Sequence, residues 1–380
     1  MPPAMAHLTV AIAGILLILA IVWDAFEALV LPRTATRTLR PTRLFYQTTW
    51  PAWVAVACSL ARGRRRESFL AIFGPLSILI LMACWATALV FGFAMIQWGL
   101  GSRFNAPTGN CGFWTDLYLS GTTLFTLGIG DVTPIGPLAR TLTVIEAGVG
   151  FGFLALVMGY LPVLYQGFSR REVNISLLDA RAGSPPSAGE LLRRHGHDMP
   201  ELETLLRDWE RWSAELMESH LSYPVLMYFR SQHEHQSWLG ALTAVLDASA
   251  LVMVGVEGAP GRQAQLTFAM ARHAVVDLAM VTGTRPCAPD PDRLPPEDFH
   301  SLQLSLVEDG VVLKEGAVAE RTLASLRAMY EPYVTGLARR LRLALPAWRA
   351  TDHELDDWRT SAWDSGSEQP RFKRDDDDHL

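Results

Sequence analysis

The sequence predicts an all-α membrane protein with an α-helical soluble domain at its carboxyl end, and charge and hydropathy lead to this fold class. Nearly half of the 380 residues are apolar, and residues 1–169 carry only about 10 basic and 6 acidic side chains. The remaining residues carry about 23 basic and 33 acidic ones. The first part therefore has the composition of membrane spans and the second that of a soluble acidic domain, which does not suit nucleic-acid binding.

The first predicted element is a transmembrane helix from Leu8 to Leu31, because this apolar run has about the ~20 residues that a bilayer crossing needs. Its amino end lacks the basic residues of a secretory signal, and Pro32 ends it. Asp24 and Glu27 lie in its last third. We expect these acids to reach the interface or to pair with the arginines that follow, in preference to a role in an ion path.

Two arginine clusters follow the first span. They consist of Arg33, Arg37, Arg40 and Arg43, and then of Arg62, Arg64, Arg65 and Arg66. The stretch Leu44–Leu60 between them is short for a span and is interrupted by Pro51, so we predict an interfacial amphipathic helix on the inner leaflet. A re-entrant segment or a fourth span is the alternative.

A long helix and a short helix come next. The apolar run Phe69–Trp98 is longer than one perpendicular crossing, which predicts a tilted or protruding outer helix. After a polar loop, apolar residues recur at three- and four-residue steps over Phe113–Phe125, which predicts a short pore helix. Thr115 and Asp116 are expected to cap its start.

The short helix leads into the run Thr126-Leu127-Gly128-Ile129-Gly130-Asp131. Glycine takes positive φ without a Cβ penalty, so Gly128 and Gly130 let the backbone alternate between left- and right-handed twists. Such alternation turns successive carbonyls toward one axis, where stacked rings of them replace the water shell of a monovalent cation.

With its flanking helices, this run resembles the pore module of the potassium channel superfamily, whose Thr-Val-Gly-Tyr-Gly-Asp signature matches Thr126–Asp131. The resemblance covers Gly99 to about Phe168, or roughly a quarter of the chain once the outer helix is included. It implies an ion-binding filter made of Thr126, Leu127, Gly128, Ile129 and Gly130, with K⁺ held at the first four. It implies that Thr122, Thr123 and Asp131 support the filter.

Two positions depart from the family pattern. Ile129 stands where the family has tyrosine, so the hydroxyl that ties the filter to pore-helix aromatics is lost. Thr122 stands where some members have a carboxylate, so the usual buried partner of Asp131 is missing. Because apolar contact is less directional than a hydrogen bond, we expect a more labile filter. Two-pore-type channels accept Ile at this position, so potassium selectivity is compatible with it.

The third predicted span, Leu138–Tyr165, is the inner helix. Family spacing places the hinge of this helix at Gly150, while Gly148, Gly150 and Gly152 also suit close helix packing; the two interpretations are compatible. The same family spacing, counted from Gly128, predicts a cavity wall made of Phe151, Leu154, Met158 and Pro162.

Two single residues in or near the membrane also call for an interpretation. Glu146 is an acid at membrane depth and therefore a functional candidate and a filter-supporting residue, with a hydrogen bond to the pore helix of a neighbouring subunit as the alternative. Cys111 in the outer loop is expected to be a free thiol, with a disulfide between subunits as the alternative.

Topology and assembly follow from these elements. Arginines concentrate on the cytoplasmic side, so the two clusters and Arg170–Arg171 place the amino terminus outside and the carboxyl-terminal domain in the cytoplasm of a multi-pass cell-membrane protein. One filter strand cannot enclose an ion, and a closed ring of four predicts a homotetramer in the lipid bilayer.

The sequence predicts four regions: 1–68 for the first span and linker, 69–168 for the pore domain, 169–365 for a helical cytoplasmic domain and 366–380 for a disordered acidic tail.

In the predicted cytoplasmic domain, Ser187 and Glu190 form a capping box, which marks the start of a helix. The helices expected after it are Asp198–Glu218, Trp238–Val256, Arg262–Val281 and Glu315–Leu345. His233 and His235 cannot share a helix face, so we expect no metal site there.

The expected function is a potassium-selective channel. A weakly selective cation channel and a membrane-anchored sensor with a vestigial pore are the alternatives. The sequence shows no catalytic constellation and no nucleotide fingerprint, so we expect no enzyme activity and no cofactor beside the transported K⁺. An unidentified ligand or protein is left open as a partner of the cytoplasmic domain.

Overall fold

The computed structural model describes residues 3–29, 40–60, 62–106, 112–196, 198–232, 235–314 and 316–349 of the chain. Arg33, Arg37, Cys111, His233 and the predicted acidic tail lie outside these ranges. The chain forms two compact units. Unit 1 contains Met1–Arg170 and Met217–Arg230, and unit 2 contains Arg171–Leu216 and Ser231–Leu380. The predicted domain boundaries stay predictions; the units differ from them chiefly because residues 217–230 belong to unit 1.

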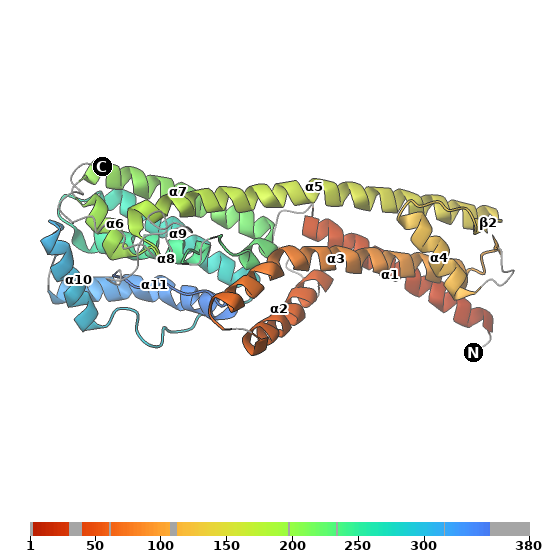
Figure 1. The fold of residues 1–380 in the computed structure, drawn as a ribbon, viewed down its shortest axis with the longest axis horizontal. Coiled ribbons are helices and arrows are strands. Elements are labelled where there is room, and N and C mark those ends of the chain that lie inside the picture. Colours follow the sequence, from red (N-terminus) through yellow and green to blue (C-terminus); the bar gives the residue numbers. More distant parts are fainter. Residues whose placement is uncertain are drawn as a thin grey trace, which may run out of the picture. The chain divides into compact units, whose positions relative to one another are not determined.

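The described residues of unit 1 form helices and one pair of short strands (Figure 1). Its elements are α1 (Pro3–Leu29), α2 (Pro41–Leu60), α3 (Arg64–Gly99), β1 (Phe104–Asn105), α4 (Phe113–Leu124), β2 (Thr133–Pro134), the first part of α5 (Pro137–Ala182), the end of α7 (Met199–Ser222) and the 3₁₀ helix η1 (Pro224–Tyr228). β1 and β2 pair antiparallel, with Phe104 opposite Pro134. This pairing joins the segment after α3 to the segment that precedes α5.

Helices α1 and α3 pack side by side through small residues (Figure 1). A Cβ on Gly14 of α1 would lie 2.6 Å from the carbonyl oxygen of Gly92 of α3. Small residues let helix backbones approach closely where the surrounding lipid offers no hydrophobic driving force. The predicted first span therefore forms a tight pair with the predicted outer helix.

The two acids near the end of α1 are buried and have partners. Glu27 forms an ion pair with Arg40, with 3.2 Å between Oε2 and Nε, as the sequence predicted. Asp24 has different partners: its Oδ2 accepts hydrogen bonds from the indole N–H of Trp85 at 3.0 Å and from the hydroxyl of Thr42 at 2.6 Å. These contacts join α1 to α2 and α3, so both acids have structural roles.

α2 is one continuous helix even though it contains Pro51. Its aromatic side chains pack on α3: Trp53 stacks on Phe69 with 4.5 Å between ring centroids, and Trp50 meets Phe73 edge-on at 4.9 Å. Its place on the inner leaflet stays a prediction.

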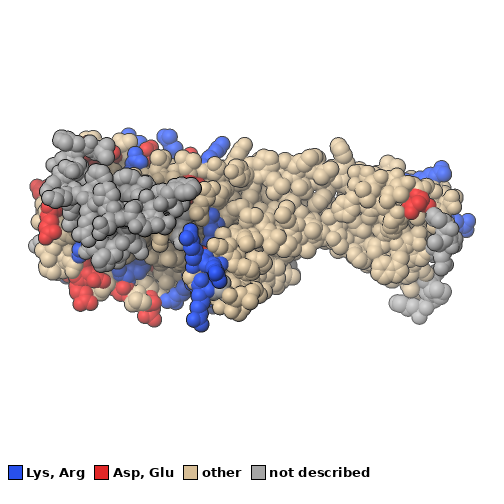
Figure 2. Space-filling view, in the orientation of Figure 1, with Lys and Arg blue, Asp and Glu red and all other residues tan. Residues whose placement is uncertain are grey.

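Four described helices, α1, α3, α5 and α8 (Trp238–Gly255), are long and apolar enough to cross a membrane. α8 is 83% buried inside unit 2, so it is a core helix. The other three belong to unit 1 and expose large apolar side chains such as Leu16, Leu79 and Leu156. On the face drawn in Figure 2, the surface of unit 1 shows no charged side chain between the blue side chains at the start of α3 and the charged side chains at the end that carries β2. Such a surface suits contact with lipid tails.

α5 is longer than the predicted inner helix. It begins at Pro137 and runs to Ala182, past the predicted end at Tyr165, with Pro162 inside it. The proline removes one backbone hydrogen bond but does not end the helix, because the residues after it continue the helical pattern.

The described part of unit 2 is mostly helical, with one antiparallel bridge between Val256 and Leu313. Its helices are the end of α5, α6 (Ala188–His195), the first part of α7, α8, α9 (Gly261–Thr282), α10 (Pro296–Glu308) and α11 (Ala317–Leu341). Ser187 accepts a hydrogen bond from the backbone N–H of Glu190 at 3.2 Å, but the carboxylate of Glu190 binds Arg193 and Arg194, so only half of the predicted capping box forms. α10 was not expected from the sequence, although Pro296 and the acids that follow it are typical of a helix start.

A buried charge network holds the core of unit 2 together. Arg293 contacts the carboxylate of Asp247 at 2.5 Å and that of Glu331 at 3.1 Å. Tyr330 donates a hydrogen bond to Asp247. Because Asp247 is fully buried, the guanidinium is what makes its charge tolerable in the interior.

Candidate functional site

The pore helix α4 begins one residue after Gly112 and ends before Phe125. The predicted caps are wrong: Gly112 is the N-cap residue, no side chain caps it, and Asp116 is buried one turn inside the helix. The backbone N–H of Phe125 donates a hydrogen bond of 3.1 Å to the carbonyl of Gly121. The chain then leaves α4 as the extended segment that was predicted to be the filter.

The backbone of the predicted filter alternates in handedness. The φ angles are 56° at Thr126, 57° at Gly128 and 82° at Gly130, while Leu127 and Ile129 do not have positive φ. A positive φ at a β-branched residue such as Thr126 costs about 1–3 kcal/mol and persists only where the surroundings impose it. Alternating handedness is the conformation that lets successive carbonyls face one side.

The start of this segment is hydrogen bonded to the end of α4. The carbonyl of Thr122 accepts the N–H of Leu127 at 2.8 Å and that of Gly128 at 3.3 Å, and the carbonyl of Thr123 accepts the N–H of Thr126 at 3.0 Å. The hydroxyl of Thr122 donates to the carbonyl of Leu119. Thr122 and Thr123 therefore hold the first three N–H groups of the segment, those of residues 126–128.

Within the described residues, the carbonyl oxygens of Thr126–Gly130 accept no hydrogen bond. All five residues are exposed, and a Cβ on Gly128 would meet nothing within 4 Å. A row of unbonded, exposed carbonyls is costly unless water, an ion or another chain covers it. What it can do chemically is coordinate a cation.

The outer end of the segment is tied to α4 by a side-chain contact. The hydroxyl of Tyr118 donates a hydrogen bond of 3.0 Å to Oδ2 of Asp131, and Oδ1 of Asp131 accepts the N–H of Val132 at 3.0 Å. Sequence reasoning expected Asp131 to lack its partner because Thr122 is not a carboxylate. Tyr118 takes that role one turn earlier in α4, and its spacing from Asp131 gave no sequence signal.

Glu146 lies behind α4 and is 1% exposed. Its carboxylate contacts the hydroxyl of Ser120, which is also 2.9 Å from the carbonyl oxygen of Val90 in α3. The partner that the structure shows is the pore helix of the same chain. A hydrogen bond to the pore helix of a neighbouring subunit stays a prediction. The contact with Ser120 joins α5, α4 and α3 directly behind the filter segment.

Gly150 lies against the end of α4. A Cβ on Gly150 would overlap the carbonyl oxygen of Leu124, whereas one on Gly148 or Gly152 would meet nothing within 4 Å of the same chain. Close packing therefore explains Gly150, and its role as a hinge stays a prediction.

The predicted cavity residues Phe151, Leu154 and Met158 lie on α5 at spacings of three and four residues and are 67%, 48% and 60% exposed. One helix face can therefore present all three to a common space. That they line a cavity stays a prediction.

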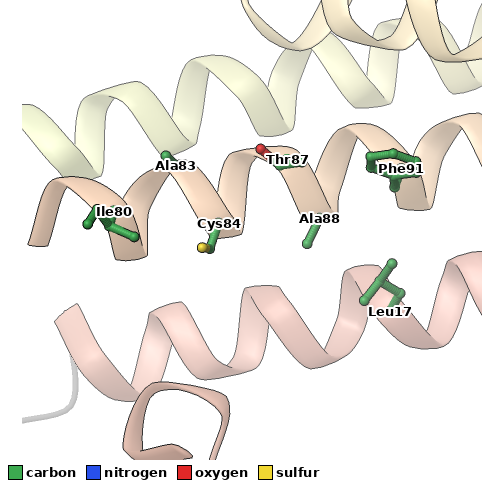
Figure 3. Close-up of a pocket in the computed structure, with 7 residues that line it drawn as sticks. All are labelled: Leu17, Ile80, Ala83, Cys84, Thr87, Ala88 and Phe91. Carbon is green, nitrogen blue, oxygen red and sulfur yellow. The ribbon is translucent and has the colours of Figure 1, made fainter. Parts of the chain in front are cut away.

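A groove of about 530 Å³ lies between α1 and α3, away from these residues. Figure 3 shows Leu17 on α1 facing Ala88 and Phe91 on α3, with the sulfur of Cys84 and the hydroxyl of Thr87 as the polar atoms. An apolar lining offers an ion almost no ligands, so this groove is not a candidate ion site. Among the described side chains, no group of three histidines, cysteines or carboxylates is arranged to hold a metal.

Comparisons with known proteins agree with this arrangement. A family model described as "Ion channel" matches residues 77–166, from the middle of α3 through the filter segment into α5. No solved structure matches the chain significantly.

Two bacterial proteins are similar to the chain. "Uncharacterized membrane protein YdjJ" of Bacillus subtilis (strain 168) is 22% identical over 258 residues, which are 67% of this chain and 74% of that protein. "Protein LctB" of Bacillus caldotenax is 36% identical over 93 residues, which are 22% of this chain and 69% of that protein. The chain is therefore a multi-pass membrane protein that belongs to the two-transmembrane ion channel family, with a pore module of the potassium-channel type.

Proposed function

We propose that the protein conducts potassium ions passively and selectively through a pore formed by four copies of this chain. The observation that carries the proposal is the row of unbonded carbonyl oxygens at Thr126–Gly130, on a backbone that alternates in handedness. Four such strands around one axis would supply rings of oxygens that replace the hydration shell of K⁺. One strand exposes its carbonyls on an open side, so the ion site needs the other three copies.

Two further features favour a cation. The carboxyl end of α4 carries the negative end of the helix dipole and directly precedes Thr126. The hydroxyl of Thr126 adds a neutral oxygen to the innermost ring. Both features stabilise a positive ion without placing a fixed negative charge in the filter, which would hold the ion too tightly for conduction.

We propose that unit 2 is cytoplasmic and that the amino terminus is outside. Arg62, Arg64, Arg65 and Arg66 stand at the start of α3, and Arg170 and Arg171 stand where α5 passes from unit 1 to unit 2. Excess arginine marks the cytoplasmic ends of spans. An odd number of crossings, through α1, α3 and α5, then places the two termini on opposite sides.

A weakly selective cation channel is the second candidate, and Ile129 is the observation that favours it. The Ile129 side chain is exposed and has no polar atom, so it cannot tie the filter to α4 by a hydrogen bond. A filter held by fewer directional contacts discriminates less between K⁺ and Na⁺ if the size of its oxygen cage sets selectivity.

The test is ion flux through the purified full-length chain in liposomes, with potassium and sodium measured in parallel. We expect K⁺ flux to exceed Na⁺ flux by at least about tenfold, as a carbonyl cage selects by size and field strength. Comparable fluxes would support the weakly selective candidate. Absence of any flux would support the sensor with a vestigial pore.

A matched pair of glycine variants tests whether the filter segment carries the flux. Gly128→Ala places a Cβ at φ 57° and should abolish flux. Gly136→Ala, just before α5, meets nothing within 4 Å at ordinary φ and should leave flux unchanged. Native mass spectrometry of both variants should report four chains, which shows that a loss of flux is not a loss of assembly.

A further inference from the structure

Residues 217–230, here called the inserted segment, leave unit 2 and pack inside unit 1. The chain before them, Arg171–Leu216, and the chain after them, from Ser231, both belong to unit 2. The inserted segment comprises the last turns of α7 and η1. Both of its ends are thus covalently continuous with unit 2, while its side chains join the core of the pore-forming unit.

The centre of the inserted segment is buried between the inner and outer helices. Leu226 is fully buried, and with Val225 it forms one apolar cluster with Leu164 of α5 and with Ile78 and Met82 of α3. Apolar burial of this completeness is typical of a domain core and not of a surface loop. The inserted segment is therefore part of the packing that positions α5 against α3.

Aromatic rings extend this packing to α2. Tyr228 stacks on Tyr46 of α2 with 5.4 Å between centroids and an interplanar angle of 8°. It also lies 5.1 Å from the ring of Trp50 and 5.4 Å from that of Phe73. Beyond it, Arg230 forms an ion pair of 2.7 Å with Glu67 near the start of α3. The segment is thereby anchored to the two helices that precede the pore module.

The contacts with α5 overlap the carboxyl-terminal end of the predicted cavity wall. Tyr223 meets Tyr160 at 5.6 Å, and Phe229 meets Phe168 at 5.5 Å, between ring centroids. Gly167 has no side chain where Leu226 approaches, since a Cβ there would lie 3.3 Å from Cδ1 of Leu226. The inserted segment therefore holds α5 from Tyr160 to Phe168, a stretch that includes Pro162 at the end of the predicted cavity wall.

We propose that the inserted segment couples unit 2 to the pore: a change in unit 2 shifts residues 217–230 against α5, and this moves the inner helix below the cavity. Packed interfaces of this kind have discrete arrangements and do not deform continuously, so a shift at one end is transmitted as a change of state. This inference rests on the proposed channel function, because it names how that pore is regulated.

A disulfide can lock the segment to the inner helix. A Cβ on Gly167 would lie 3.9 Å from Cβ of Ser219, within the range of about 3.5–4.5 Å that disulfides require. The full chain should carry Gly167→Cys and Ser219→Cys in a background where Cys58, Cys84, Cys111 and Cys287 are replaced by serine. Each single cysteine variant is the matched control.

A second variant loosens the same contact. Leu226→Ala removes the buried side chain at the centre of the segment, and Glu218→Ala, at an exposed position of α7 in the same segment, is its control. K⁺ flux in liposomes is measured for all variants, and the cysteine variants are measured before and after reduction. Disulfide formation is quantified by thiol labelling.

We expect oxidation of the double cysteine variant to change K⁺ flux at least about fivefold, reversibly on reduction, because the lock removes the motion of α5 against the segment. Leu226→Ala should change flux in the opposite direction, since it frees that motion. The proposal would be overturned if K⁺ flux stayed unchanged both after full disulfide formation and in Leu226→Ala. It would also be overturned if the cysteines at positions 167 and 219 did not cross-link. Absence of flux from the unmodified chain would instead refute the channel function on which the proposal rests.

Discussion

The phenolic hydroxyl of Tyr118 donates a 3.0 Å hydrogen bond to the carboxylate of Asp131, which joins the pore helix to the outer end of the filter segment. The same carboxylate accepts the N–H of Val132. Ile129, which has no polar side-chain atom, provides no hydrogen bond of this kind. Tyr118 therefore supplies a directional contact that the isoleucine cannot give, and the more labile filter expected from the sequence stays a prediction.

Removing the hydrogen bond between Tyr118 and Asp131 should shorten channel openings. Tyr118→Phe keeps the ring and deletes the hydroxyl, so the outer end of the filter loses its connection to α4 while packing is unchanged. Single-channel recordings should show a shorter mean open time than in the unmodified protein. Tyr333→Phe in α11 deletes a hydroxyl in unit 2 and is the control. Equal open times in all three proteins would show that Asp131 does not need this tie.

The contact between Glu146 and Ser120 predicts different outcomes for two variants of Glu146. Ser120 has one hydroxyl proton and two acceptors, the carbonyl of Val90 and the carboxylate of Glu146. Glu146→Gln supplies an N–H donor to Ser120 and should preserve assembly. Glu146→Leu removes the hydrogen bond between α5 and α4, while the hydroxyl of Ser120 keeps the carbonyl of Val90 as its acceptor, and should cost about 0.5–1.5 kcal/mol.

Thermal unfolding of the assembled protein in detergent measures this difference for Glu146. The melting temperature of Glu146→Gln should be close to that of the unmodified protein, and that of Glu146→Leu should be lower. A leucine variant as stable as the unmodified protein would mean that the contact between α5 and α4 contributes nothing to the fold.

A glycine pair tests how closely α5 packs on the end of α4. Gly150→Ala forces a methyl group into the carbonyl oxygen of Leu124, and overpacking against backbone should cost about 1–3 kcal/mol. Gly148→Ala meets nothing in its own chain and should be neutral or slightly stabilising, because alanine favours a helix over glycine by up to about 1 kcal/mol. Assembly yield and melting temperature compare the two; equal effects would count against the close packing.

In unit 2, the buried arginine should matter far more than an exposed one. Arg293→Ala leaves the fully buried carboxylate of Asp247 without its guanidinium partner, while Glu331 keeps its ion pair with Arg327, and should cost about 3–5 kcal/mol. Arg207→Ala breaks the exposed pair with Glu203 and should cost at most about 1 kcal/mol. Urea unfolding followed by tryptophan fluorescence reports the loss, since Trp348 lies 5.7 Å from Arg293. A small effect at Arg293 would mean that the network is dispensable.

His195 should make unit 2 less stable in mild acid. Burial lowers the pKa of His195 below its ordinary 6.5, although the carbonyl of Leu191 and the carboxylate of Glu201 oppose the shift. The unfolded chain then takes up a proton that the folded chain does not, so stability falls as the pH drops below about 6.5 toward the lowered pKa. The melting temperature should decrease more between about pH 7.5 and pH 5.5 in the unmodified protein than in His195→Gln. Parallel curves for the two proteins would exclude His195 as the cause.

The local pattern of apolar residues in the sequence was sufficient to predict much of the fold. The apolar runs predicted α1, α3 and the first part of α5 to within a few residues, and the three- and four-residue steps predicted α4. These elements satisfy their own backbone hydrogen bonds, so residues near in sequence decide them. α10 and η1 were missed, because short helices depend on tertiary packing more than on propensity.

By itself, the sequence determined where the pore module lies and predicted which residues form its filter strand, because glycine spacing and hydropathy act locally. Only the tertiary structure decided that Tyr118 supports Asp131, that Glu146 binds Ser120 of its own chain, and that residues 217–230 belong with the pore-forming unit. The physical reason is that these contacts join distant parts of the chain. Which polar or apolar groups meet there depends on how the helices pack, and no local periodicity encodes it.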